Sequence, residues 1–197
     1  MEEDSVMSAV IAESVSLYEQ LLALPEKVVG EIIAGQLYTQ PRPTGPHIMA
    51  ASVLAGEIYR PYHKGRGGPG GWWILVEPEI HFVRDTEVLV PDIAGWRRER
   101  LPKIPADHRF EVAPDWVCEV LSPSTAKKDR IDKMPVYARY GVACLWLVDP
   151  LARTLEVFTL QDGCWLVWGL YRDNAEVSAP PFQDITLALT DLWVEVE

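Results

Sequence analysis

The sequence predicts a mixed α/β domain organised around one strand, helix and strand unit. Residues 115–150 carry this unit as an apolar strand, a Ser/Pro turn, a polar helix and a second apolar strand. Residues 5–24 and 47–62 repeat apolar side chains at helical spacing, and strand-like runs fill much of the remaining chain. A chain of 197 residues with 48% apolar content can bury one substantial core, so we expect a single domain spanning residues 1–197.

The N-terminal part, residues 1–45, is predicted to hold a helix and a hairpin. The helix runs from Ser5 to Leu24 and ends before Pro25, because proline disfavours helical backbone in the residue that precedes it. The hairpin pairs residues 31–33 with residues 36–38 around an Ala-Gly turn. Glu31 opens this hairpin, where it is either a solvated edge residue or a functional carboxylate.

The core part, residues 46–150, begins with a predicted helix from His47 to Tyr62. His47 is either a cap or surface residue of this helix, or a residue that faces a phosphate. Residues 64–71 are too rich in glycine for regular structure and predict a flexible loop, without the motif of a nucleotide-binding loop. Residues 72–83 and 88–93 supply strands, and the second strand carries Pro91 and Asp92.

The C-terminal part, residues 151–197, is predicted to be a β extension of the sheet. Residues 153–160 and 164–171 alternate as two strands joined by a Gln-Asp-Gly turn. Residues 185–193 are predicted to end the domain as a strand or a short docked helix. This part offers no candidate chemistry.

One carboxylate stands in an apolar row of the central unit. Side chains alternate along a strand, so Val117, Glu119 and Leu121 share one face of the strand over residues 116–121. Burial of an ionised carboxylate is costly, so Glu119 is expected to meet a cation, a metal or a hydrogen-bonding network. The alternative is a structural ion pair with a neighbouring Arg or Lys.

A second carboxylate, Asp92, also ends an apolar run. Its separation from Glu119 is short enough for the two strands to be neighbours in one sheet. Hard oxygen ligands of this kind suit Mg²⁺ or Mn²⁺, which take one or two carboxylates from a protein. An ion held there can activate water for a phosphodiester displacement if a cation assists.

The assisting cation is expected on the helix that follows. The simplest position, two residues after Glu119 on the same strand face, holds Leu121. The helix instead offers Lys and Arg at positions 127, 128, 130 and 133. Lys133 lies at the edge of the predicted apolar stripe, from which a long side chain can reach a strand end. The alternative for Lys133 is a solvated lysine on an amphipathic helix.

Two details of this helix are predicted. Its apolar stripe consists of Ile131, Met134 and Ala138. Pro135 removes a backbone donor and crowds the carbonyl of Ile131, so the helix is expected to bend near Lys133.

Charge and cysteine usage restrict the function classes. The net charge of -11 argues against nonspecific coating of nucleic acid and leaves room only for a local basic groove. Cys118, Cys144 and Cys164 lie in apolar runs without a CxxC motif, so we expect small buried side chains in a reducing compartment. Early acidic residues and the lack of a long apolar run lead us to expect a cytoplasmic protein with no membrane partner.

Several of these residues together resemble a known family. They are Pro91-Asp92, the run EVLSPST from Glu119 to Thr125, Asp129, Lys133, Tyr137, Gly141-Val142 and Trp146 to Pro150. At these positions the sequence resembles the Uma-type restriction endonuclease family within the PD-(D/E)XK nuclease superfamily. The hairpin from Glu31 to Gly35 and His47 are similar to N-terminal features of the family. The resemblance covers nearly the whole chain and is most specific from Glu119 to Pro150.

The resemblance implies a restriction-endonuclease-like fold, with a mixed β-sheet core flanked by helices. It implies that Asp92 and Glu119 bind a metal ion and that Lys133 is the catalytic lysine, displaced from the strand onto the helix. Leu121 departs from the basic pattern of the superfamily. Many members are assigned as nucleases by fold alone, and a fold does not establish an activity.

The leading hypothesis is an endonuclease that uses Mg²⁺ or Mn²⁺ to hydrolyse DNA. Asp92 and Glu119 hold the metal with the Val120 carbonyl as a further ligand, and Lys133 stabilises the attacked phosphate. Glu31 and His47 are outer candidates for the catalytic site. A homodimer is expected, because 8 Trp residues and apolar C-terminal strands provide surface to bury.

Two other interpretations stay open. A catalytically inactive nuclease-fold module that binds nucleic acid or protein is favoured by Leu121 and by the net charge of -11. An all-β ligand-binding domain is favoured by the many strands rich in Trp and Val, and it predicts little helix.

Overall fold

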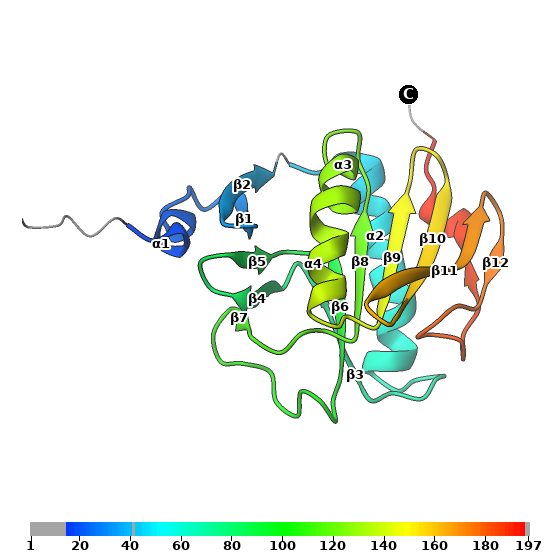
Figure 1. The fold of residues 1–197 in the computed structure, drawn as a ribbon. Coiled ribbons are helices and arrows are strands. Elements are labelled where there is room, and N and C mark those ends of the chain that lie inside the picture. Colours follow the sequence, from blue (N-terminus) through cyan, green and yellow to red (C-terminus); the bar gives the residue numbers. More distant parts are fainter. Residues whose placement is uncertain (1–14, 41, 196–197) are drawn as a thin grey trace, which may run out of the picture.

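A six-stranded sheet forms the centre of the computed structural model, which describes residues 15–40 and 42–195 (Figure 1). The spatial order of its strands is β11-β10-β9-β8-β6-β3. Their bounds are Trp72–Val76 for β3, Ile93–Arg97 for β6, Trp116–Val120 for β8, Cys144–Asp149 for β9, Thr154–Gln161 for β10 and Cys164–Arg172 for β11. β8 and β9 are parallel and the other neighbours are antiparallel, so the sheet is mixed. The parallel pair requires a crossover, which the predicted helix supplies.

Two helical segments cover opposite faces of this sheet (Figure 1). The first consists of α2, Gly45–Ile58, and a π-helical turn η1, Tyr59–His63. The second consists of α3, Ala126–Lys128, a π-helical turn η2, Asp129–Lys133, and α4, Met134–Arg139. These helices show that the all-β interpretation is wrong.

The side chains of β8 alternate between two cores, as predicted. Trp116, Cys118 and Val120 pack in the core that contains Leu54 and Ile58 of α2. Val117 and Leu121 pack in the core that contains Val136 and Tyr137 of α4. Because both faces of β8 are buried, Glu119 on the α4 face is buried too.

A second, five-stranded sheet has the order β2-β1-β5-β4-β7 and lies beside the first (Figure 1). Its strands are β1, Val29–Ile33, β2, Gln36–Gln40, β4, Glu79–Val83, β5, Glu87–Leu89, and β7, Arg109–Phe110. The remaining elements are α1, Leu17–Leu22, the strand pair of β12, Glu176–Val177, with β13, Leu187–Ala188, and the 3-10 helix η3, Leu189–Leu192. The predicted end of the domain therefore contains both a short strand and a short helix.

The two predicted hairpin turns are confirmed. Ala34 and Gly35 both have positive φ, at 51° and 69°, between β1 and β2. Asp162 and Gly163 repeat this with φ of 49° and 76° between β10 and β11. Positive φ at both central residues matches the right-handed twist of paired strands.

Two predicted element bounds are wrong. The strand over residues 88–93 is interrupted, because β5 ends at Leu89 and β6 begins at Ile93 in the other sheet. Pro91 has no N–H for a ladder, which explains the break. Residues 5–14 of the predicted N-terminal helix lie outside the described residues. Within them the helix begins only at Leu17, after a capping box of Ser16 and Glu19.

The π-helical turn η2 lies where the helix is predicted to bend near Lys133. Met134 donates its N–H to the carbonyl of Asp129, five residues back, just before Pro135, which has no N–H. One extra residue in a turn rotates all following side chains by about 100° around the helix axis. The predicted stripe is therefore wrong at Ile131, which is 63% exposed, and Lys133 is 1% exposed rather than at the edge.

Other expectations concern cysteine and membranes. Cys118 and Cys144 are buried as predicted, but Cys164 is exposed because it begins the edge strand β11. Within residues 15–40 and 42–195, no helix combines the length and apolar character that crossing a bilayer requires.

Two glycines provide a matched test of this backbone. Gly141 ends α4 with φ of +74°, Gly56 is helical in α2, and a Cβ on either would meet no atom within 4 Å. We expect Gly141→Ala to lower the free energy of unfolding by about 1 kcal/mol through backbone strain. We expect Gly56→Ala to raise it by about 0.5–1 kcal/mol. Urea denaturation measures both, and a change of the same sign in both variants would contradict the assigned backbone.

Candidate active site

Glu119 obtains its polar partners from the helix that packs on its face of β8. The Tyr137 hydroxyl donates to Glu119 Oε1 at 2.5 Å, and Lys133 Nζ lies 2.8 Å from the same oxygen. The Glu119 side chain is 3% exposed. The prediction that Glu119 is buried is therefore confirmed, and its partners are a tyrosine hydroxyl and a lysine.

Lys133 joins carboxylates from three parts of the chain. Its Nζ lies 2.8 Å from Glu31 Oε1 and 2.8 Å from Glu119 Oε1, and 3.8 Å from Asp129 Oδ1. It also donates to the Val90 carbonyl at 3.4 Å. Lys133 is thus a buried ammonium held by a strand, a hairpin and its own helix, and the solvated-lysine alternative is wrong.

Glu31 lies on β1 and connects the two sheets to the helix. Its Oε1 accepts the Val90 N–H at 2.9 Å, and its Oε2 accepts from Lys128 Nζ at 2.6 Å and from Gln40 Nε2 at 2.5 Å. Its side chain is 0% exposed. Glu31 is therefore not a solvated edge residue.

Asp92 and His47 form a second polar pair next to Glu119. His47 Nε2 donates to Asp92 Oδ1 at 2.7 Å, and the Val120 N–H donates to Asp92 Oδ2 at 2.6 Å. β6 and β8 pair Ile93 with Cys118 in antiparallel register, so Asp92 and Glu119 are the next positions of the same two strands. The prediction that their strands are neighbours is confirmed, and His47 contacts a carboxylate in this structure.

The buried charges of this cluster are unbalanced. Three buried carboxylates, Glu31, Glu119 and Asp129, share two ammonium groups, Lys128 and Lys133, whereas Asp92 pairs with His47. Burial, with repulsion from the other carboxylates, raises the pKa of Glu119 to about 8 although Lys133 opposes this. Burial also acts to raise the pKa of Glu31, but Lys133 and Lys128 outweigh it and the pKa is lowered. Glu119 therefore binds a proton more easily than Glu31 does.

His47 is the side chain that contacts Asp92 from α2. Burial acts to lower the pKa of His47, but the hydrogen bond to Asp92 and the charge of Asp92 raise it. The His47 side chain is 12% exposed, and its Nδ1 is buried and has no hydrogen-bond partner within the described part of the chain.

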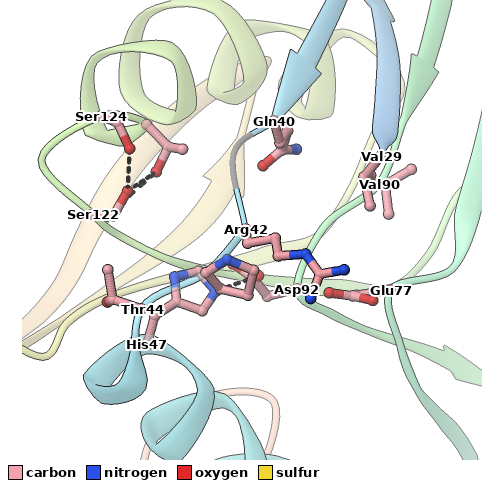
Figure 2. Close-up of a pocket in the computed structure, with 12 residues that line it drawn as sticks. Val29, Gln40, Arg42, Thr44, His47, Glu77, Val90, Asp92, Ser122 and Ser124 are labelled. Atoms are coloured by element: carbon pink, nitrogen blue, oxygen red, sulfur yellow. Dashed lines mark hydrogen bonds and ion pairs between the residues drawn. The ribbon is translucent and has the colours of Figure 1, made fainter. Parts of the chain in front are cut away.

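A cavity of about 60 Å³ opens beside Asp92 (Figure 2). Figure 2 shows His47, Asp92, Arg42 and Glu77 gathered at one side of it, and hydrogen-bonded hydroxyl groups at the other. These hydroxyl groups belong to Ser122, Ser124 and Thr125. Glu119 and Lys133 lie buried and do not line the cavity.

Sequence reasoning missed two contributors to this site. The sequence analysis gives Arg42 no role, although a cation just before a helix that starts near His47 is a usable signal. Lys128 was one of four candidate cations, and nothing in the sequence distinguished its contact with Glu31.

The donor set fits a hard divalent cation better than a zinc ion. No three His, Cys, Asp or Glu side chains are grouped to hold a metal ion within the described residues. Mg²⁺ and Mn²⁺ need only one or two protein carboxylates and complete their shell with water and phosphate. Asp92 and Glu119 meet that need at adjacent strand positions, and the excess of buried carboxylates favours a bound cation.

Comparison with known proteins identifies relatives over nearly the whole chain. The model of the Uma2 family, described as "Putative restriction endonuclease", matches residues 16–190. A crystal structure of "a putative nuclease" from Anabaena variabilis ATCC 29413 has a TM-score of 0.72 and 25% sequence identity. The match covers 91% of this chain and 97% of that chain, which confirms the predicted restriction-endonuclease-like fold class. No curated protein matches the sequence.

Replacement of Lys133 tests the buried cluster. We expect Lys133→Met to lower the free energy of unfolding at pH 7 by about 3 kcal/mol, because three buried carboxylates lose their shared cation. Without the Lys133 ammonium, the pKa values of the three carboxylates rise in the folded state. The folded variant then binds more protons than the unfolded chain. The difference in free energy of unfolding between the wild type and Lys133→Met should therefore become smaller as the pH falls from 7 to 5.

The matched control is Lys127→Met, because Lys127 is an exposed lysine of the same helix. Urea denaturation across this pH range should show a change within about 0.5 kcal/mol for the control. Equal stability of the two variants would contradict the assigned role of Lys133.

Proposed function

The chain belongs to the Uma2 family, which carries the description "Putative restriction endonuclease", and from this premise we propose that it is a metal-dependent endonuclease that hydrolyses phosphodiester bonds in DNA. The family and the fold support a nuclease role. The observation that carries the proposal is the convergence of Lys133, Glu119 and Glu31 beside Asp92, which faces a cavity.

In this proposal, Asp92, Glu119 and the carbonyl of Val120 hold Mg²⁺ or Mn²⁺. The bound ion would neutralise charge on the phosphate and lower the pKa of a water molecule. Lys133 places a cation next to Glu119 in a site with little solvent, where it stabilises developing negative charge. The pKa of Glu119 near 8 means that a divalent ion would replace a proton there.

Glu31 and His47 act by positioning other residues of the site. Glu31 and Asp129 fix the ammonium of Lys133, so Glu31 is a positioning residue. His47 and the Val120 N–H together fix both oxygens of Asp92, which makes His47 a positioning residue as well.

Arg42 and the hydroxyl groups of Ser122 and Thr125 line the cavity, where they could contact a phosphate.

A nuclease assay on plasmid and single-stranded DNA with Mg²⁺ or Mn²⁺ tests the activity. We expect Asp92→Asn and Glu119→Gln each to lower the rate by about 100-fold or more, because each removes a charged ligand. Glu57→Gln is the matched control, since Glu57 is an exposed acid on α2. Full activity in the Asp92 and Glu119 variants would remove the assignment.

Calorimetry with Mn²⁺ separates an enzyme from the inactive nuclease-fold module, which has no need of a metal at Asp92 and Glu119. We expect the wild type and Glu57→Gln to bind Mn²⁺, and Asp92→Asn to bind it at least about tenfold more weakly. Wild-type protein that binds DNA but no Mn²⁺ would favour the binding module.

We also propose a homodimer, supported by the edge strand β11. Four large apolar side chains of this strand are between 46% and 67% exposed, namely Leu166, Val167, Trp168 and Leu170. A long apolar edge strand without a partner promotes aggregation. Light scattering should give the mass of a dimer for the wild type and of a monomer for the double variant Trp168→Glu, Leu170→Glu. A wild-type monomer at micromolar concentration would refute the proposal.

A further inference from the structure

The turn η1 follows α2 at one end of the six-stranded sheet, next to β3 (Figure 1). A basic surface lies there, at the end of α2 that is opposite to His47. Two segments form it, residues 59–73 and residues 94–98, and neither contains an Asp or Glu. Together they carry five Lys and Arg side chains, which we call the basic end: Arg60, Lys64, Arg66, Arg97 and Arg98. A surface of this sign is unexpected in a chain with a net charge of -11.

Hydrogen bonds hold the two segments together. The Arg98 N–H donates to the Gly71 carbonyl at 2.9 Å, and the Arg98 guanidinium donates to the His63 carbonyl at 2.7 Å. β3 and β6 pair Trp72 with Arg97 directly. The basic end is therefore one continuous part of the fold.

The glycine-rich loop is fixed to the end of the helix. The Arg66 N–H donates to the Arg60 carbonyl and the Gly70 N–H to the Pro61 carbonyl, each at 3.0 Å. A Cβ on Gly68 would lie only 2.4 Å from the Cβ of Pro61, so the loop packs too closely there for any larger residue. The loop, predicted from the sequence as flexible, has no regular structure but is tied to η1 at these points.

The five cations of the basic end lack acidic partners. Within the described residues none of them forms an ion pair, whereas the next arginine along the chain, Arg100, pairs with Asp115 at 2.8 Å. Four of the five are exposed and Arg98 is half-buried. Like charges kept together without counter-ions repel one another, so this surface is suited to a polyanion.

Aromatic rings hold three of the cations in place. The Arg98 guanidinium lies 4.0 Å from the ring centroid of Trp73, Arg97 lies 4.8 Å from that of Trp72, and Lys64 Nζ lies 5.3 Å from that of Tyr59. Such contacts restrict the side chains before any ligand arrives, which reduces the entropy lost on binding.

We propose that the basic end binds the phosphate backbone of a DNA duplex outside the cleavage site. This inference rests on the proposed function and extends the substrate from a phosphodiester bond to a long duplex. Arginine and lysine supply phosphate contacts that are independent of sequence, and the glycines of the loop allow a backbone to approach closely. Among the described residues, no large exposed apolar side chain comes from these two segments, which argues against insertion into a membrane.

The length of the helical segment made of α2 and η1 sets the shortest duplex that can contact both the cleavage site and the basic end. His47 and His63 lie at opposite ends of α2 and η1, about 24 Å apart at about 1.5 Å per residue. This distance corresponds to about seven base pairs at about 3.4 Å each. Glu57 is the one acidic residue of this segment between residues 45 and 63. A duplex of about six base pairs therefore cannot contact both ends, whereas one of about 24 base pairs can.

A charge-matched pair of variants tests this inference. The first variant carries Arg60→Ser, Lys64→Ser and Arg66→Ser in the basic end. The control carries Lys27→Ser, Arg84→Ser and Arg172→Ser, three exposed cations elsewhere on the surface. Both variants lose the same three charges, so a general effect of net charge is equal in both. Circular dichroism and thermal unfolding confirm that each variant is folded.

Fluorescence anisotropy in EDTA measures binding without cleavage. With a duplex of about 24 base pairs we expect the first variant to bind at least about tenfold more weakly than the control, and the slope of log K against log salt to fall by about 2 to 3. With a duplex of about six base pairs the control should bind at least about tenfold more weakly than it binds the long duplex, because the short duplex offers fewer phosphates. Equal affinities of the two variants for the long duplex would overturn the proposal.

Two further outcomes separate the inference from the proposed function. If the wild type binds the long duplex through the basic end but no metal supports cleavage, the proposed function fails and the inference stands. If the wild type cleaves DNA and the first variant keeps full affinity, the inference fails alone. Binding to vesicles that contain phosphatidylserine, lost in the first variant while duplex binding is kept, would also overturn it.

Discussion

The fold around the site depends on one buried ammonium group. Lys133 contacts Glu31 from the five-stranded sheet, Glu119 from the six-stranded sheet and Asp129 from its own helix. A single buried carboxylate would be costly without a cation, and these contacts let three elements share one. The ammonium therefore stabilises the junction of two sheets and a helix. The same junction is where the carboxylates that fit a metal ion come together.

The π-helical turn η2 makes this arrangement possible. A regular α-helix through residues 126–139 would direct Ile131 toward the core and leave Lys133 at its edge. The extra residue in the turn rotates the helix so that Ile131 is exposed and Lys133 is buried. Such turns occur often at functional sites. Pro135 removes the N–H that would have continued regular pairing.

The charges of the molecule are separated along α2. Its first residues lie beside Asp92 and a cluster with an excess of carboxylates, and its last residues lead into η1, which belongs to a surface that carries five cations. A polyanionic substrate would be repelled by the first region unless a metal ion were bound there, and attracted by the second. The net charge of -11 is therefore a poor guide to how the two ends of this helix meet a nucleic acid.

The sequence by itself determined the strand, helix and strand unit, both hairpin turns and the neighbouring strands of Asp92 and Glu119. These follow from local rules, because alternation, turn chemistry and chain connectivity act over a few residues. Tertiary structure alone decided that Glu31 is buried and that it forms an ion pair with Lys133, since this contact joins residues far apart in the chain. It also decided that β5 and β6 join different sheets on either side of Pro91, and it decided the assembly of the basic end, because neither the sheet that a strand joins nor charge clustering in space has a local signal.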